Sequence, residues 1–231
     1  MHLLRSLAAA VVALTGLVTG SASADAPAIA TDWDQTLAVE STDRQWQAIV
    51  VHHSATMRGT VAGIHRHHRD VNGWDGIGYH FVIGNGDGIA DGRVEPTYRW
   101  REQRTGAHAG HRGFNEFGIG VCLIGHFDRQ PPTQAQLRAL KQLRDELGQR
   151  YELAETRLIP HGRIKGTACP GRHFPPSLLL PPETDLPEIA ATTAAAPAGD
   201  PIAGHVTPSC DDVPRLVRRP ADRQSPRMDP Y

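Results

Sequence analysis

Apolar positions in the middle of the chain fall into short runs that are typical of buried strands. The clearest run spans residues 46–53, with three β-branched residues at its centre and two histidines at its end. Similar runs at 79–83 and 119–124 predict two more strands, and Leu158-Ile159 predicts a short one. Asn85-Gly86-Asp87-Gly88 is typical of a tight turn, so we expect the strand at 79–83 to have a hairpin partner.

Two segments between these runs carry a helical pattern instead. Thr60 can cap a helix that Asn72-Gly73 ends, and its buried face is expected to hold Val61, Ile64, His68 and Val71. Thr133, with Gln136 as its capping-box partner, begins a longer helix. The apolar face of that helix is expected to comprise Leu137, Leu140, Leu143, Leu147 and Tyr151. This order of elements predicts the α/β class, with a single domain built on a central mixed sheet flanked by helices.

The N-terminal segment is typical of a signal peptide. Arg5 precedes an apolar stretch over residues 7–18, and Ala22-Ser23-Ala24 is a typical signal-peptidase site. The stretch is too short to span a bilayer, and no later segment predicts a transmembrane helix. We therefore interpret residues 1–24 as a signal peptide and expect a periplasmic or extracellular protein, with a retained N-terminal anchor as the alternative. Residues 25–44 are interpreted as an N-terminal extension.

The C-terminal segment has a composition that disfavours a folded core. Residues 181–231 are rich in Pro, Ala, Thr and Asp and lack hydrophobic periodicity. Such a segment buries too little apolar surface to offset the entropy of ordering, so we interpret it as a disordered tail. The folded domain is therefore expected to cover residues 45–180.

Charge and cysteine content narrow the possible functions. The net charge of −1 and the absence of a long basic run argue against a nucleic-acid partner, and we expect a monomer. The chain has three cysteines, an odd number for an exported protein. Cys122 lies in a predicted strand and Cys210 in the predicted tail. Cys169 therefore needs another explanation.

Possible metal ligands occur where predicted strands end. His52 and His53 end the first strand, His161 follows the last one, and Cys169 stands eight residues further on. Imidazole and thiolate ligands together suit zinc, and three protein ligands leave a position where a water molecule could be activated. Sequence spacing alone leaves a simpler alternative open, in which the histidines are structural and Cys169 belongs to an ordinary turn.

Five ordered segments between about residues 45 and 176 resemble the zinc-dependent N-acetylmuramoyl-L-alanine amidases, a family that includes the peptidoglycan recognition proteins and a phage amidase lysozyme. The segments are Ile49-Val50-Val51-His52-His53-Ser54-Ala55-Thr56, residues 73–83, Gly106-Ala107-His108-Ala109, residues 119–125, and His161-Gly162-Arg163 with Thr167-Ala168-Cys169-Pro170-Gly171. The resemblance implies a sheet flanked by helices, with Zn²⁺ at the floor of a groove that binds peptidoglycan. It also implies hydrolysis of the amide bond between N-acetylmuramic acid and L-alanine.

The resemblance also implies roles for individual residues. His52, His161 and Cys169 match the three zinc ligands. Tyr79 matches a tyrosine that assists near the attacking water and the developing oxyanion. Thr167 matches a position that helps to polarise the scissile carbonyl. Four further residues match positions that line or border the substrate groove: His68, Trp74, His108 and Asn115.

One departure from part of the family affects the general base. Cytoplasmic members have an aspartate as third ligand and an acidic side chain in the strand that matches residues 119–124, where this chain has Cys122 and Ile124. Tyr79 is then the best candidate for the base, and a water activated by zinc alone is the alternative. Two other functions stay open: a peptidoglycan-binding module without catalysis, and a zinc amidase that acts on another acylated peptide.

Overall fold

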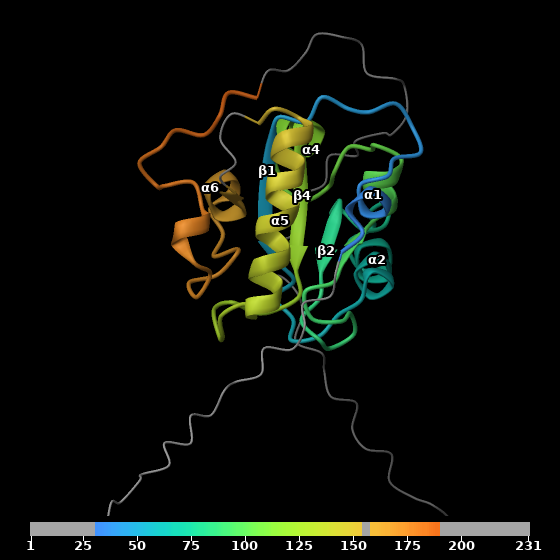
Figure 1. The fold of residues 1–231 in the computed structure, drawn as a ribbon. Helices are drawn as coiled ribbons and strands as arrows, with labels where there is room; N and C mark the ends of the chain where they lie inside the picture. Colours follow the sequence, from blue (N-terminus) through green and yellow to red (C-terminus); the bar gives the residue numbers. More distant parts are fainter. Residues whose placement is uncertain (1–30, 154–157, 190–231) are drawn as a thin grey trace, which may run out of the picture.

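A computed structural model describes residues 31–153 and 158–189 (Figure 1). The predicted signal peptide, the first part of the predicted N-terminal extension and most of the predicted tail lie outside the described residues. No helix within the described ranges is both long enough and apolar enough to cross a membrane.

The sheet has five strands in the order β3-β2-β4-β1-β5. They are β1 (Ala48–His53), β2 (Phe81–Ile83), β3 (Val94–Pro96), β4 (Gly118–Leu123) and β5 (Ile159–Pro160). β1 pairs in parallel with β4 and β5, β2 pairs in parallel with β4, and β3 pairs antiparallel with β2. The predicted mixed sheet and the predicted hairpin are therefore confirmed.

Side chains alternate strictly between the two faces of the central strands, as the pleat requires. On β4, the large residues Ile119, Val121 and Leu123 join the main apolar core. The intervening positions, Gly118, Gly120 and Cys122, face the other side. One face of the central sheet is thus filled by large apolar groups, while the other keeps room for polar side chains.

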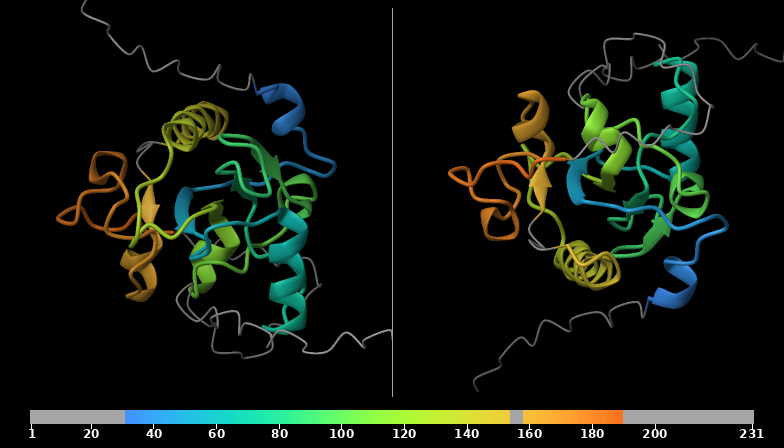
Figure 2. Two further views of the ribbon diagram at one scale, coloured as in Figure 1. Left: turned by 90° about the horizontal axis from the view of Figure 1, so that it is seen from below. Right: turned by 90° about the horizontal axis from the view of Figure 1, so that it is seen from above.

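One long helix covers the large-residue face. α5 (Gln134–Arg150) packs there, with Trp100 and Leu37 completing the same core, and α2 (Val61–Asp70), α4 (Arg112–Phe117) and α6 (His161–Lys165) lie on the opposite side of the sheet (Figure 2). The leucines predicted for the apolar face of α5 pack into the main core against the sheet, and Leu140, Leu143 and Leu147 are wholly buried. Five other helices of the described residues are too short to show a helical pattern of apolar residues and were not predicted. They are α1 (Trp33–Thr36), α3 (Tyr98–Arg101), α4, α6 and the 3-10 turn Pro176–Leu178.

The predicted start of α2 is confirmed, but one residue of its predicted buried face is wrong. Thr60 caps the helix by accepting a hydrogen bond from the Gly63 N–H at 3.0 Å. Val71, expected on the buried face, is 60% exposed. The helix ends at Asp70, and the chain then turns through Gly73, whose φ is +70°. Val71 is therefore outside the regular helix and does not follow its apolar stripe.

The folded domain extends past the predicted boundary at residue 180. The guanidinium of Arg163 on α6 donates hydrogen bonds to the Pro181 and Thr184 carbonyls at 2.9 and 2.8 Å. Leu186 and Ile189 pack against the smaller apolar cluster beside β1 and β5. Residues 181–189, which composition assigns to the tail, are thus held by α6 in the structure.

Gln136 joins the start of α5 to the ends of two strands. Its side-chain carbonyl accepts from the Thr133 N–H, completing the predicted capping box. Its amide group donates to the carbonyls of Ile83 and Ile124 at 3.2 and 2.8 Å, and the side chain is almost wholly buried.

We expect Gln136→Ala to lower the free energy of unfolding by about 2 to 3 kcal/mol, because it removes a cap and takes a buried donor away from the Ile124 carbonyl, whereas the Ile83 carbonyl keeps the Ile124 N–H. Urea denaturation followed by circular dichroism measures the change. Gln134→Ala, at the exposed first position of the same helix, is the matched control and should change stability by less than about 0.5 kcal/mol. Equal midpoints for the two variants would contradict this role of Gln136.

Candidate metal centre

His52 lies on the small-residue face of the sheet, near the end of the central strand β1. The side chain is wholly buried, with an exposed fraction of 0%. Because β1 runs between β4 and β5, its position is set by hydrogen bonds on both sides. His53, the next residue, points to the opposite face and contacts the ring of Phe127.

β5 brings His161 to the same level of the sheet as His52. Pro160 pairs with Val51, so the residues that follow these two lie side by side, and the two imidazole centroids are 4.5 Å apart. His161 is the first residue of α6 and is buried.

A short loop returns Cys169 to the same point. The Gly162 N–H donates to the Cys169 carbonyl at 2.8 Å, which closes the loop after α6. A Cβ at Gly162 would lie 2.4 Å from the Thr167 carbonyl oxygen, so the closure requires glycine there. The thiol is buried, and its Sγ lies 3.9 Å from Nδ1 of His52.

The three side chains fit a zinc ion. The ligand atoms of His52, His161 and Cys169 all lie within 4.8 Å of one another. Tetrahedral zinc with normal bond lengths holds such nitrogen and sulfur atoms about 3.3 to 3.6 Å apart, so small side-chain movements would complete the geometry. The backbone N–H of His53 donates to Cys169 Sγ at 3.4 Å, a contact that stabilises a thiolate. The sequence names the same three residues as candidate ligands, and the structure brings them together.

Comparisons with known proteins agree on one family. A family profile described as N-acetylmuramoyl-L-alanine amidase matches residues 42–172. This chain belongs to that family. The resemblance that the five sequence segments indicate is therefore confirmed at the level of the family.

Relatives of the amidase-family domain come from phages, animals and bacteria. The endolysin of Escherichia phage T7 is 36% identical over 138 residues, which cover 57% of this chain and 82% of the phage protein. The N-acetylmuramoyl-L-alanine amidase of Sus scrofa is 34% identical over 119 residues, covering 51% of this chain but only 18% of the pig protein. The solved structure of the amidase LysC from Clostridium intestinale URNW has a TM-score of 0.50 and 30% identity, and the match covers 57% of this chain and 80% of that chain.

Tyr79 and Thr167 of the amidase-family domain both lie beside the ligand cluster. The Tyr79 ring is buried, and its centroid is 5.1 Å from that of His52. Thr167 is half-buried, and its hydroxyl oxygen accepts the Cys169 N–H at 3.2 Å. The Tyr79 ring thus lies against the cluster next to His52, and the Thr167 hydroxyl lies in the Cys169 loop.

His68 and Trp74 form one wall next to Tyr79. Their ring centroids are 4.8 Å apart, and the His68 ring is 5.5 Å from that of Tyr79. His68 Nδ1 also accepts the Gly78 N–H at 3.0 Å, which ties α2 to the segment that carries Tyr79. Trp74 is half-buried.

His108 is buried behind His52, and the half-buried Asn115 holds its backbone. The His108 ring is packed beneath His52, with Nδ1 3.0 Å from His52 Nε2. Burial, and next the neighbouring His52, lower the pKa of His108 well below its usual value of 6.5. Asn115 Oδ1 accepts the N–H groups of His108 and Ala109 at 2.9 and 2.8 Å. In the structure, Asn115 therefore holds the backbone that presents His108.

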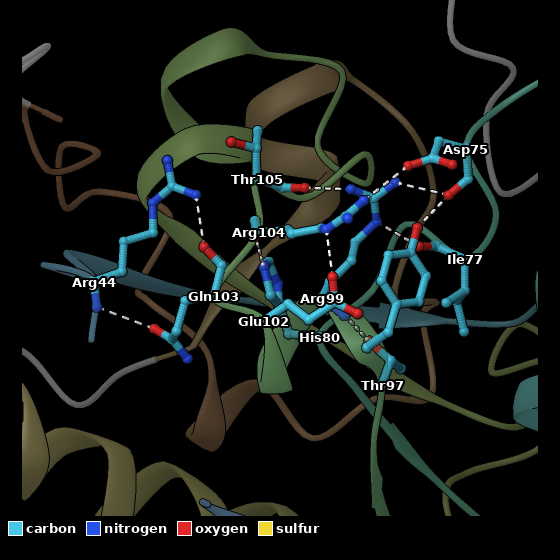
Figure 3. Close-up of polar contacts among 11 residues, drawn as sticks. Arg44, Asp75, Ile77, His80, Thr97, Arg99, Glu102, Gln103, Arg104 and Thr105 are labelled. Atoms are coloured by element: carbon cyan, nitrogen blue, oxygen red, sulfur yellow. Dashed lines mark hydrogen bonds and ion pairs between the residues drawn. The ribbon is translucent and has the colours of Figure 1, made fainter. Parts of the chain in front are cut away.

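A buried arginine that the sequence does not single out joins the two segments on either side of the site. Arg99 Nε donates to the Ile77 carbonyl at 2.5 Å, and its two terminal nitrogens donate to the carbonyls of Thr105 and Asp75 (Figure 3). Ile77 leads into Tyr79 and Thr105 leads into His108. No motif marks Arg99, because its partners are backbone atoms whose proximity depends on the fold.

His80 is a second group that the sequence does not single out. Nδ1 accepts the Gly120 N–H at 2.9 Å. Nε2 donates to the Arg104 carbonyl at 3.0 Å, a bond that Figure 3 shows. Burial lowers the pKa of His80 to about 3, so the ring is neutral at physiological pH. His80 thus supports β4 beside the site without bringing a charge to it.

A second group of potential ligands, His53, His126 and Asp128, also lies within 4.8 Å. The Phe127 N–H donates to His53 Nδ1 at 3.2 Å, so the proton of the neutral His53 ring is on Nε2. A metal at this group would have to displace that proton. The group is therefore a poorer metal site than the cluster around His52.

We expect Cys169→Ala to abolish zinc retention, because it removes the only anionic ligand of the cluster. The zinc content of the variant after gel filtration, measured by elemental mass spectrometry, checks this prediction. Cys122→Ala is the matched control, since Cys122 is also a buried cysteine but is outside the ligand group. That variant should keep close to one zinc per chain, and loss of zinc in both variants to the same extent would argue against Cys169 as ligand.

Proposed function

We propose that this chain is a zinc-dependent hydrolase that cleaves the amide bond between N-acetylmuramic acid and L-alanine in peptidoglycan. One observation carries the proposal: in a member of the amidase family, the buried side chains of His52, His161 and Cys169 lie close together beside Tyr79. Three protein ligands are typical of catalytic zinc, whereas structural zinc is normally closed by four.

The charge of the ligand set suits attack on an amide. When bound, a zinc ion supplies the Lewis acidity that polarises the scissile carbonyl and makes a water molecule nucleophilic near neutral pH. Two neutral imidazoles and one thiolate cancel only one of its two positive charges. The residual positive charge favours the oxyanion that develops on the substrate.

We assign to Thr167 a hydrogen bond to the substrate. Its oxygen accepts the Cys169 N–H, a bond that does not use the hydroxyl proton, so this proton can be donated to the scissile carbonyl oxygen. Donation to that oxygen strengthens as negative charge develops there in the transition state.

Tyr79 is placed to act from the other side of the cluster. Its ring contacts that of His52, and we assign its hydroxyl to the developing oxyanion and to the attacking water. The leaving amine must gain a proton as the C–N bond breaks, and the tyrosine hydroxyl can relay the proton taken from the water.

The N-terminal sequence supports delivery of the enzyme to this substrate. Residues 1–24 have the composition of a signal peptide, and peptidoglycan lies outside the cytoplasmic membrane. The exposed part of Trp74, next to His68, offers an apolar surface for a muramyl peptide. Export and peptidoglycan binding are parts of the same proposal.

Digestion of purified peptidoglycan tests the proposed activity. With zinc, we expect free stem peptides that begin with L-alanine, and glycan chains that remain uncut, as identified by mass spectrometry. A chelator should abolish product formation, and added zinc should restore it. New sugar reducing ends would overturn the proposal, binding without any product would identify a binding module, and activity only on other acylated peptides would identify a different amidase.

We expect Tyr79→Phe to lower kcat by about 10²- to 10³-fold, because it removes a donor to the oxyanion. Zinc content should stay at the wild-type level, since Tyr79 is not a ligand. Tyr151→Phe is the matched control: Tyr151 bonds Asp43 at the end of α5, across the sheet from the site. Steady-state kinetics on soluble muramyl peptides measures both variants, and a wild-type kcat in Tyr79→Phe would refute the assigned role.

A further inference from the structure

A chain of hydrogen bonds runs from one metal ligand through a second histidine to the backbone. Nε2 of His52 lies 3.0 Å from Nδ1 of His108, and both rings are buried. On its far side, Nε2 of His108 lies 3.2 Å from the Gly118 carbonyl oxygen at the start of β4. Each of these hydrogen bonds needs one donor and one acceptor, so the chain determines which ring nitrogen of His52 and of His108 carries a proton.

The backbone end of the chain sets the direction. A carbonyl oxygen only accepts hydrogen bonds, so the His108 nitrogen that faces Gly118 must carry a proton. A neutral imidazole has one N–H, and Nδ1 of His108 is therefore an acceptor. Nε2 of His52 must then donate to it. This leaves the lone pair of His52 on Nδ1, the atom that lies 3.9 Å from Cys169 Sγ.

We propose that His108 is a positioning residue, which holds His52 in the Nε2–H tautomer so that the Nδ1 lone pair points to the metal. The inference rests on the proposed zinc centre. With the opposite tautomer, an N–H would point at the cation and the ligand bond could not form. A hydrogen-bond acceptor behind a metal-binding histidine also orients the ring and increases its basicity.

Packing holds His108 in this position. A Cβ on Gly120 or Gly106 would lie 2.5 or 2.4 Å from Cδ2 of the His108 ring, so the ring occupies the space that these two glycines leave. Asn115 fixes the backbone of His108 from the other side. The acceptor is therefore in place before a metal arrives, and binding does not have to order it.

The neutral acceptor also has an electrostatic consequence. Many metal-binding histidines donate to a carboxylate, which would add a second negative charge next to the thiolate of Cys169. An imidazole acceptor fixes the same tautomer without that charge. The centre thus keeps the residual positive charge on which amide hydrolysis depends.

The tautomers can be observed directly in the metal-free wild-type protein. Long-range proton–nitrogen correlation NMR at pH 7 distinguishes an imidazole protonated at Nε2 from one protonated at Nδ1. We expect both His52 and His108 to be protonated at Nε2. An Nδ1–H on either ring, or protons on both nitrogens of His108, would overturn the inference without requiring any variant to fold.

Zinc affinity gives a second test that is independent of activity. His108→Phe keeps a ring but removes the acceptor, and competition with a chromogenic chelator should show about 10- to 100-fold weaker zinc binding. His108→Gln restores an acceptor and should recover part of the loss. His80→Phe is the matched control, because His80 is also a buried histidine with backbone partners, and the folded fraction of this variant should bind zinc as the wild type does.

The two proposals fail in different ways. If the wild-type protein does not bind zinc, the proposed function is wrong, whereas the tautomer measurement on the metal-free protein is unaffected. If the wild type binds zinc and folded His108→Phe binds it equally well, His108 has no positioning role and the proposed function stands. Equal losses in His108→Phe and His80→Phe would show a general effect of core disruption and would also overturn the inference.

Discussion

The parallel pairing of β1 with β4 and β5 is the constraint on which the candidate metal centre depends. Neighbouring parallel strands run in one direction, so residues that follow paired positions arrive at the same level of the sheet. Val51 pairs with Pro160, and the next residues on the two strands are His52 and His161. A shift of β5 by one residue would turn His161 away from the site. Cys169 then needs only the short closed loop after α6 to reach the same point.

The pleat of the sheet places the side chains that stabilise the domain on one face and those of the candidate site on the other. On β1 and β4, the large apolar side chains face α5 and fill the main core, which supplies the stability of the domain. The opposite face carries His52, Cys122 and two glycines. The ring of His108 fills the space that a side chain at position 120 would need. Glycine within a strand usually lowers the stability of the strand, but here it leaves room for a buried polar group.

Neutral groups surround the cluster and preserve its charge. His80 and His108 are both neutral because burial lowers their pKa values, and each has a backbone partner that satisfies its ring. Arg99 carries a charge, but its guanidinium is bound by carbonyl oxygens of the two segments that lead into Tyr79 and His108. The protein thus orders the site with dipoles, and the Cys169 thiolate would be the anionic group of the proposed ligand set.

Local physics made much of this protein predictable from its sequence. The apolar runs located the central strands, Thr133 and Gln136 marked the start of α5, and the ordered segments indicated the family. Predictions were weaker where a local pattern competes with tertiary contacts. Val71 left the buried face because the helix ended one residue earlier, and residues 181–189 are held by Arg163 although their composition is that of a tail.

The sequence by itself determined the kind of ligands, because imidazole and thiolate have a chemical preference for zinc that needs no coordinates. Only the tertiary structure decided how they are presented. The contact of His52 with His108 and that of His108 with the Gly118 carbonyl arise only in the fold, as does the bond from Arg99 to the Ile77 carbonyl before Tyr79. These contacts join residues that are far apart along the chain, and a hydrogen bond between them exists only once the sheet has brought them together.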